Sequence, residues 1–305
     1  MSVTTLNTHI MRIFLFLAIV GLLIGCKDQD PELAKIGELE KQVETAPSAE
    51  NTKALVDAYR QYIDTHPGEV EENADLLFKS ASLQFHMNRL NGAVKALHEA
   101  LRDYYPASKT PDNALLLATL YGDKLQNPIG ASAVYEGFVE AFPDHPRSKG
   151  LRDSLLQGQP GLIAQIDSLR SRLYNDQTNR IDYEVANDFI GVCEIYGLLL
   201  PADQHTPDYL HEAAKTAGYI RSFPKALELY EWLYEKYPTH EKAAQALFMM
   251  GFTYDNEIKD IDKAKELYEA FIEKYPDNDF ADDARFLLEN LGKSDEEIIS
   301  SFGNE

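Results

Sequence analysis

Six prolines divide the chain, and similar patterns of apolar residues precede them. The positions one, five and eight residues before each proline are mostly large and apolar or aromatic, as in Tyr268, Phe271 and Tyr275. Residues three or four apart share one face of an α-helix, so the pattern predicts a buried stripe. Proline supplies no N–H and disfavours helical geometry in the residue before it, so each helix should end there. The six are Pro67, Pro106, Pro143, Pro201, Pro238 and Pro276.

These prolines recur with a nearly constant period. Their spacings are 39, 37, 58, 37 and 38 residues, so one interval is long. Most intervals between these prolines also contain an earlier helical pattern, upstream of the helix that ends at the proline. In it a small residue follows a leucine by four positions, as in Leu210 and Ala214. Such helix pairs cannot bury both apolar faces alone and must stack on their neighbours. The sequence therefore predicts an all-α solenoid of about six helical hairpins, with roughly fifteen helices in all.

The last two intervals resemble the tetratricopeptide repeat. In the final one, Leu247 and Gly251 lie on the first helix, and Ala264 and Tyr268 lie on the second, before Pro276. The Tyr-Pro ending followed by "ADDARF" is similar to helical-repeat lipoproteins of the bacterial outer membrane, including the lipoprotein of β-barrel assembly and envelope scaffolds. The resemblance covers residues 50–292 and implies a tetratricopeptide-like fold. It also implies a groove, lined by the first helices of successive units, that holds protein or peptide partners.

The register of that family selects candidate partner-binding residues. Exposed phenylalanines would be apolar anchors of the kind that carry binding energy; the alternative is that they pack against neighbouring units. His211 and Lys215, one helical turn apart, would add a positive spot for an acidic or C-terminal carboxylate group. The candidates are His211, Lys215, Phe248, Phe252, Phe78 and Phe85.

The N-terminal segment predicts export and lipidation. Arg12 precedes an uncharged apolar run over residues 13–24, which is too short for a membrane-spanning helix and has the size of a signal peptide. The sequence Leu-Ile-Gly-Cys at 23–26 resembles the cleavage box of bacterial lipoproteins, which implies a lipid on Cys26 that anchors the chain to a membrane. The alternative is a buried helix with a chance cysteine. Translation could begin at Met1 or Met11. Lys27 after the cysteine favours an outer-membrane lipoprotein, facing the periplasm or the cell surface.

A predicted order of segments follows from these signals. Pro160 interrupts the repeat pattern, and an amphipathic stretch follows it with no clear place in the repeat. We interpret this stretch as an inserted helix and polar loop that could divide the solenoid into two arms. The segments are a signal peptide at 1–25, a tether at 26–32, an N-terminal repeat arm at 33–158, the insertion at 159–180, a C-terminal repeat arm at 181–292 and a cap at 293–305.

Charge and composition restrict the function further. The 305 residues carry a net charge of −21. Cleavage before Cys26 would remove one basic residue and no acid among 25 residues, leaving 280 residues at −22. Because a chain this acidic repels phosphate, we expect no nucleic-acid partner. Cys193 would then have no intrachain disulfide partner, and we expect a small apolar core residue there.

No catalytic or metal-binding constellation is recognisable in the sequence. The eight histidines are scattered, and neither a glycine-rich phosphate loop nor a nucleophile elbow occurs. We therefore expect no cofactor, no metal and no enzymatic activity. The predicted function is a lipid-anchored cell-envelope scaffold that binds proteins or peptides, with outer-membrane protein assembly as one candidate process. The alternative is an envelope enzyme or cell-wall-associated protein with its site in the 159–180 insertion or between the two arms.

Overall fold

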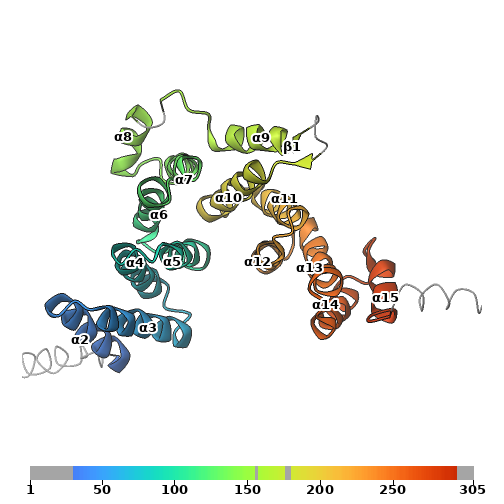
Figure 1. The fold of residues 1–305 in the computed structure, drawn as a ribbon, viewed down its shortest axis with the longest axis horizontal. Helices are drawn as coiled ribbons and strands as arrows, with labels where there is room; N and C mark the ends of the chain where they lie inside the picture. Colours follow the sequence, from blue (N-terminus) through green and yellow to red (C-terminus); the bar gives the residue numbers. More distant parts are fainter. Residues whose placement is uncertain (1–29, 155–156, 176–179, 294–305) are drawn as a thin grey trace, which may run out of the picture. The chain divides into compact units, whose positions relative to one another are not determined.

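The structure, a computed structural model, describes residues 30–154, 157–175 and 180–293 (Figure 1). Within these ranges it contains fourteen α-helices, two π-helical turns and two strands of two residues each. The prediction of an all-α repeat fold is confirmed. The signal peptide with Cys26 and all of the predicted cap except Lys293 lie outside the described ranges. Among the residues described, no helix is both long enough and apolar enough to cross a membrane.

The chain divides into two compact units between Glu69 and Val70, which is not one of the predicted boundaries. The first unit contains α2 (Pro31–Thr45) and α3 (Ala49–Thr65), which pack against each other. Their interface buries Ile36 of α2, and Leu55 and Tyr59 of α3. Asp30 and Ser48 cap the two helix N-termini through their side chains.

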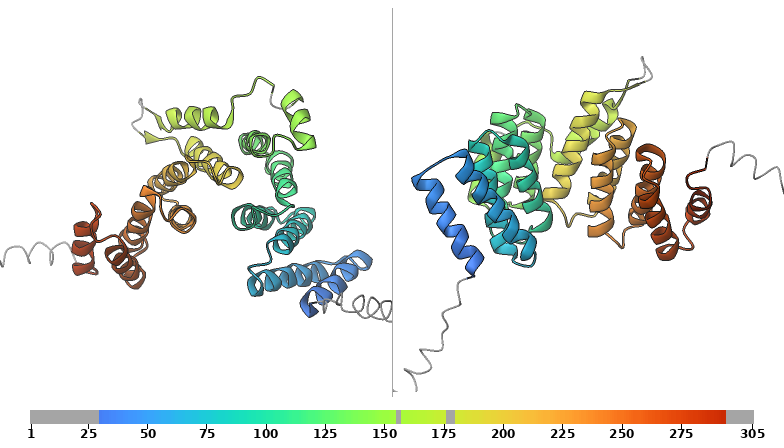
Figure 2. Two further views of the ribbon diagram at one scale, coloured as in Figure 1. Left: turned by 180° about the vertical axis from the view of Figure 1, so that it is seen from behind. Right: turned by 60° about the horizontal axis from the view of Figure 1, so that its bottom comes forward.

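The second unit contains all remaining elements, which Figure 2 shows from two further sides. Its first part consists of α4 (Val70–His86), α5 (Leu90–Asp103), α6 (Thr110–Thr119) with the π-helical turn η1 (Leu120–Lys124), α7 (Pro128–Ala141) and α8 (Pro146–Ser154). Then follow α9 (Leu162–Arg172), β1 (Tyr174–Asn175), β2 (Arg180–Ile181) and α10 (Tyr183–Leu199). The last part consists of α11 (Thr206–Tyr219), α12 (Phe223–Lys236), α13 (Glu241–Thr253) with η2 (Tyr254–Ile258), α14 (Ile261–Lys274) and α15 (Ala281–Glu289).

The prolines end helices where the sequence predicts. Each of the six lies two or three residues beyond the last residue of a helix, for example Pro238 after Lys236 and Pro276 after Lys274. The stripes before them form the core: Tyr230, Tyr268 and Phe271 are essentially fully buried. Small residues let the helices of a pair approach closely. An added Cβ at Gly251 would lie 3.0 Å from two ring carbons of Tyr268 on the partner helix.

The inserted helix expected in the interruption of the repeat is present as α9 and has a place among its neighbours. Helix α9 packs on α10 and also contacts α7, so it joins the stack of helices. The stretch after it, expected to be only a polar loop, begins and ends in the antiparallel pair β1–β2, in which Tyr174 faces Ile181. Helix α10 is buried nearly all round because it contacts α5, α7, α9 and α11. The proposed division into two arms stays a prediction.

Candidate functional site

A cavity of about 450 Å³ lies where α11, α12 and α13 meet. We call it the aromatic groove. Helix α11 contributes His211, Lys215 and Tyr219 to its wall, and the other elements contribute aromatic side chains among others. The latter include Phe223, Tyr230, Phe248, Phe252 and Phe280. The structure thus brings together the four C-terminal candidates, whereas whether they bind a partner stays a prediction.

Phe248 lines the groove and belongs to the core. Its side chain is only 7% exposed, and its ring stacks on Phe280 with centroids 4.9 Å apart. It also meets the Phe271 ring edge-on at 5.6 Å. Of the two alternatives left open by the sequence, packing against neighbouring helices is therefore correct for Phe248. Phe252, one turn later, stays half-buried and stacks on Phe248 at 6.5 Å, so it presents the more accessible ring.

The positive spot expected from His211 and Lys215 is reduced to Lys215. Burial, helped by Lys242 and Lys215, lowers the pKa of His211 to about 4, so this imidazole is neutral at pH 7. Its ring lies 6.0 Å from that of Tyr230, at the groove wall. Lys215 is exposed and makes no ion pair with any described residue. An unpaired ammonium beside aromatic rings can receive a carboxylate of a bound segment.

Phe78 and Phe85 lie elsewhere. The Lys109 ammonium sits 4.6 Å from the centre of the Phe78 ring, and the Lys124 ammonium sits 5.1 Å from that of Phe85. Phe78 lines a separate cavity of about 230 Å³ near α6 and α8. These two rings are half-buried and take no part in the aromatic groove.

Some residues that line the groove were not among the candidates predicted from the sequence. Tyr219 follows His211 and Lys215 at the same helical spacing and is 64% exposed, so its position could have been inferred. Phe280 precedes α15 and reaches the groove only because α14 folds back along α13. No local sequence pattern predicts that contact.

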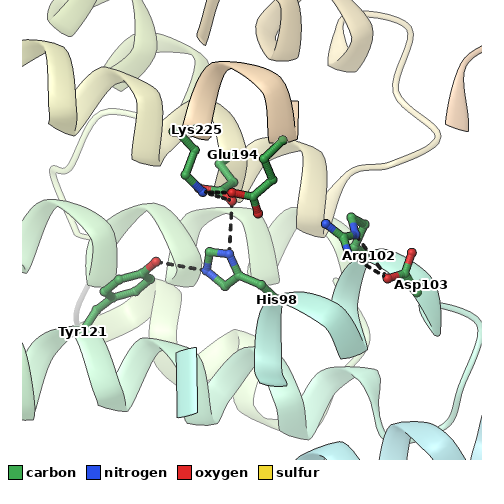
Figure 3. A network of polar contacts seen from close by, with 7 residues as sticks. His98, Arg102, Asp103, Tyr121, Glu194 and Lys225 are labelled. Carbon is green, nitrogen blue, oxygen red and sulfur yellow. Dashed lines mark hydrogen bonds and ion pairs between the residues drawn. The ribbon is translucent and has the colours of Figure 1, made fainter. Parts of the chain in front are cut away.

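A second cluster of functional groups gathers around Glu194 (Figure 3). The Glu194 carboxylate lies 3.2 Å from Nδ1 of His98 and accepts a hydrogen bond from the Lys225 ammonium at 3.1 Å. Burial alone would raise the pKa of this carboxyl, but His98 and Lys225 outweigh it and lower the pKa to about 2. On its other side, Nε2 of His98 lies 3.1 Å from the Tyr121 hydroxyl, whose pKa burial raises.

This cluster joins helices that are distant in the sequence. His98 lies on α5, Glu194 on α10 and Lys225 on α12, and all three line a cavity of about 600 Å³. A second bridge runs beside it, because the Lys236 ammonium of α12 lies 2.9 Å from the Asp103 carboxylate of α5. The repeat pattern does not predict this cluster, although a glutamate inside the apolar run of α10 indicates a buried charge with partners.

Two other candidates for chemistry are a metal site and the thiol of Cys193. No three His, Cys, Asp or Glu side chains among them gather in a way that could hold a metal ion. Cys193 is buried in α10, and burial raises the pKa of its thiol well above the ordinary value. A thiol kept protonated in this way is a packing residue rather than a nucleophile.

Comparison with known proteins agrees with this geometry. The family model described as "Tetratricopeptide repeat" matches residues 245–278, which include most of α13, all of η2 and α14, and Pro276. The chain contains a tetratricopeptide repeat. That repeat carries Phe248 and Phe252, and tetratricopeptide domains in general bind protein partners. A search of curated proteins gave no match.

Proposed function

We propose that this tetratricopeptide-repeat protein is a non-enzymatic scaffold that binds a segment of a partner protein in the aromatic groove. The proposal rests on one observation. The half-buried Phe252 ring and the unpaired Lys215 ammonium line one cavity of about 450 Å³ within the α11–α13 repeat pair. Aromatic rings that are partly accessible provide binding energy, and a free cation orients an acidic group.

The groove favours a segment that combines an apolar side chain with a carboxylate. The apolar side chain would lie against Phe252 and Phe223, and the exposed Tyr219 would cover it from the rim. The carboxylate would face Lys215. Since His211 is neutral at pH 7, it offers a hydrogen bond to the bound segment and no charge.

We further propose that the scaffold is held at the cell envelope by a lipid on Cys26. The support is the apolar run at 13–24 and the Leu-Ile-Gly-Cys box that ends at Cys26. Attachment to the outer membrane, facing the periplasm or the cell surface, is the location we infer from Lys27. Assembly of outer-membrane proteins is one process that such a scaffold could serve.

The groove proposal is tested by placing a photo-crosslinking amino acid, p-benzoylphenylalanine, at Phe252 in cells that produce the protein. The matched control carries it at Phe286, a ring of α15 that is 41% exposed and does not line the groove. We expect a crosslinked protein partner from position 252 that is absent at 286. Equal crosslinking from both positions, or none from 252, contradicts a docking groove.

The enzymatic alternative has one observation in its favour. In the chain Glu194–His98–Tyr121, a carboxylate orients an imidazole toward a hydroxyl, which is the order of groups in nucleophile activation. However, burial raises the pKa of Tyr121, which makes its phenolate harder to form. The Lys225–Glu194 ion pair also ties this cluster into the packing of α10 and α12. We therefore favour binding over catalysis.

A further inference from the structure

Two adjoining cavities flank Tyr135 of α7. The first, of about 530 Å³, lies between α7 and α9 and includes Arg172 in its lining. The second, of about 230 Å³, includes Arg147 of α8. Tyr135 lines both cavities and is the residue they share, and we call the two together the Tyr135 groove. Figure 1 shows α8 and α9 following α7 in the region that interrupts the repeat.

The Tyr135 groove contains hydrogen-bond donors that the described chain does not use. Among the described residues, the hydroxyl of Tyr135 has no hydrogen-bond partner, and neither has the guanidinium of Arg147. Arg172 uses only its Nε, which donates to the carbonyl of Ser168 at 3.2 Å. One carboxylate, Asp112, lines the groove, and the Lys109 ammonium at 3.1 Å already pairs with it.

The charge of this region is opposite to that of the rest of the chain. Residues 145–180 contain six basic residues and three acids, whereas the whole chain has 29 basic residues and 50 acids. The net charge of the region is therefore +3, and that of the remaining chain is −24. Among the six, Arg170 pairs with Asp167 and Glu212. The other five make no ion pair with a described carboxylate: Arg147, Lys149, Arg152, Arg172 and Arg180.

We propose that the Tyr135 groove is a second docking site, which binds an acidic segment of a partner protein. Carboxylates of the segment would pair with Arg147 and Arg172, and the Tyr135 hydroxyl would donate a hydrogen bond between them. Hydrogen bonds between guanidinium and carboxylate are among the strongest in proteins, and arginine suits them through its planar fork. The site differs from the aromatic groove in both its position and its ligand, so it goes beyond the function proposed above.

A narrow protein segment fits these observations better than a lipid surface does. A membrane leaflet is broad, so an anionic leaflet would also face the rest of the chain. The net charge of that rest is −24, and the leaflet would repel it. An acidic peptide is small enough to contact the basic region alone. The region also holds the inserted helix α9, so the site depends on a feature that regular tetratricopeptide repeats lack.

The probe is a fluorescently labelled hexaglutamate peptide, with hexaglutamine as its uncharged counterpart, titrated with the full chain and followed by fluorescence anisotropy. We expect hexaglutamate to bind and hexaglutamine not to bind, with an affinity that falls as salt rises. Reversal of both charges, Arg147→Glu with Arg172→Glu, should weaken binding by about tenfold or more. Tyr135→Phe removes only the hydroxyl and should weaken binding by about threefold.

The matched control is Lys263→Glu with Lys265→Glu on α14, which changes the net charge equally at exposed positions outside the groove. This control should lower the affinity by much less than the arginine pair does. Equal losses in the two double variants would show a general effect of charge and overturn the proposal, as would absent hexaglutamate binding. Vesicles of phosphatidylglycerol and phosphatidylcholine form the last arm. If they bind in an arginine-dependent way while hexaglutamate does not, the site is a lipid site and the proposal is wrong.

Discussion

The replacement Gly251→Ala tests the packing that holds the matched repeat together. Gly251 lies on α13, and a Cβ there would stand 3.0 Å from two carbons of the Tyr268 ring and 3.4 Å from Cβ of Leu267. The ring cannot easily move, because Tyr268 is fully buried on α14 and its hydroxyl hydrogen-bonds to Asp255. Gly191 of α10 offers a matched control, since a Cβ there would have no neighbour within 4 Å.

The expected magnitudes follow from two opposing effects. In an unobstructed helix, replacing glycine by alanine stabilises by about 0.5–1 kcal/mol, because glycine loses more backbone entropy on folding. We expect this gain for Gly191→Ala. Extra volume in a packed core costs about 1–3 kcal/mol, so Gly251→Ala should lower the unfolding free energy by about 1 kcal/mol after the helical gain is subtracted.

The assay is urea unfolding followed by circular dichroism on both variants and the wild type. The urea midpoint should fall for Gly251→Ala and rise for Gly191→Ala, while the slope of the transition stays unchanged. If Gly251→Ala is as stabilising as Gly191→Ala, then α13 and α14 do not approach as closely as the structure has them. The assignment of Gly251 to the small-residue position of the repeat would then fail.

Three further predictions concern the groove and the anchor. Phe248→Ala should lower the unfolding free energy by about 3–5 kcal/mol because its ring is buried, whereas Phe252→Ala should lower it by about 1 kcal/mol. Similar losses for the two variants in thermal unfolding would contradict the different burial of the two rings. As the pH falls, the unfolded chain binds a proton at a histidine with the ordinary pKa of 6.5, while folded His211 stays neutral until about pH 4. Stability is therefore lost across this window, and His211→Gln should make the urea midpoint fall less steeply there; an unchanged slope would refute the lowered pKa. Cys26→Ser should abolish incorporation of labelled fatty acid, and equal labelling of variant and wild type would show that the lipid is not on Cys26.

Helix ends and repeat register could be predicted from the sequence because their determinants are local. A proline and a stripe of aromatic residues fix where each second helix stops, and this held for all six prolines. The repeat register also selected His211, Lys215, Phe248 and Phe252, which lie together in the aromatic groove. Their shared position follows from the stacking of α11 and α13, which the repeat period already implies.

Burial and charge at the same residues could not be predicted in this way. Phe248 is a core residue because Phe271 and Phe280 reach it from α14 and the segment before α15. His211 is neutral because of its burial and the nearby lysines, of which Lys242 is distant in the sequence. Such properties depend on contacts between helices, and a single helix pattern does not contain them.

The cluster around Glu194 shows the same limit more strongly. Its bond to His98 joins residues 96 positions apart, and its bond to Lys225 joins residues 31 positions apart. Neither separation matches the repeat period, and the bond to His98 depends on a contact of α10 with α5, which is distant in the sequence. The repeat pattern therefore predicted the stack of helices but not the polar contacts that cross it.

The central claim is that the aromatic groove binds a protein segment through Phe252 and Lys215. The most direct measurement is a selection of displayed random peptides on the wild-type chain, followed by affinities of the enriched peptides for the variant Phe252→Ala with Lys215→Glu. We predict that the enriched peptides pair a large apolar residue with an acidic one. They should lose about tenfold or more in affinity for this variant and keep it for Lys263→Glu. Enriched peptides that bind the groove variant as tightly as the wild type would contradict the claim.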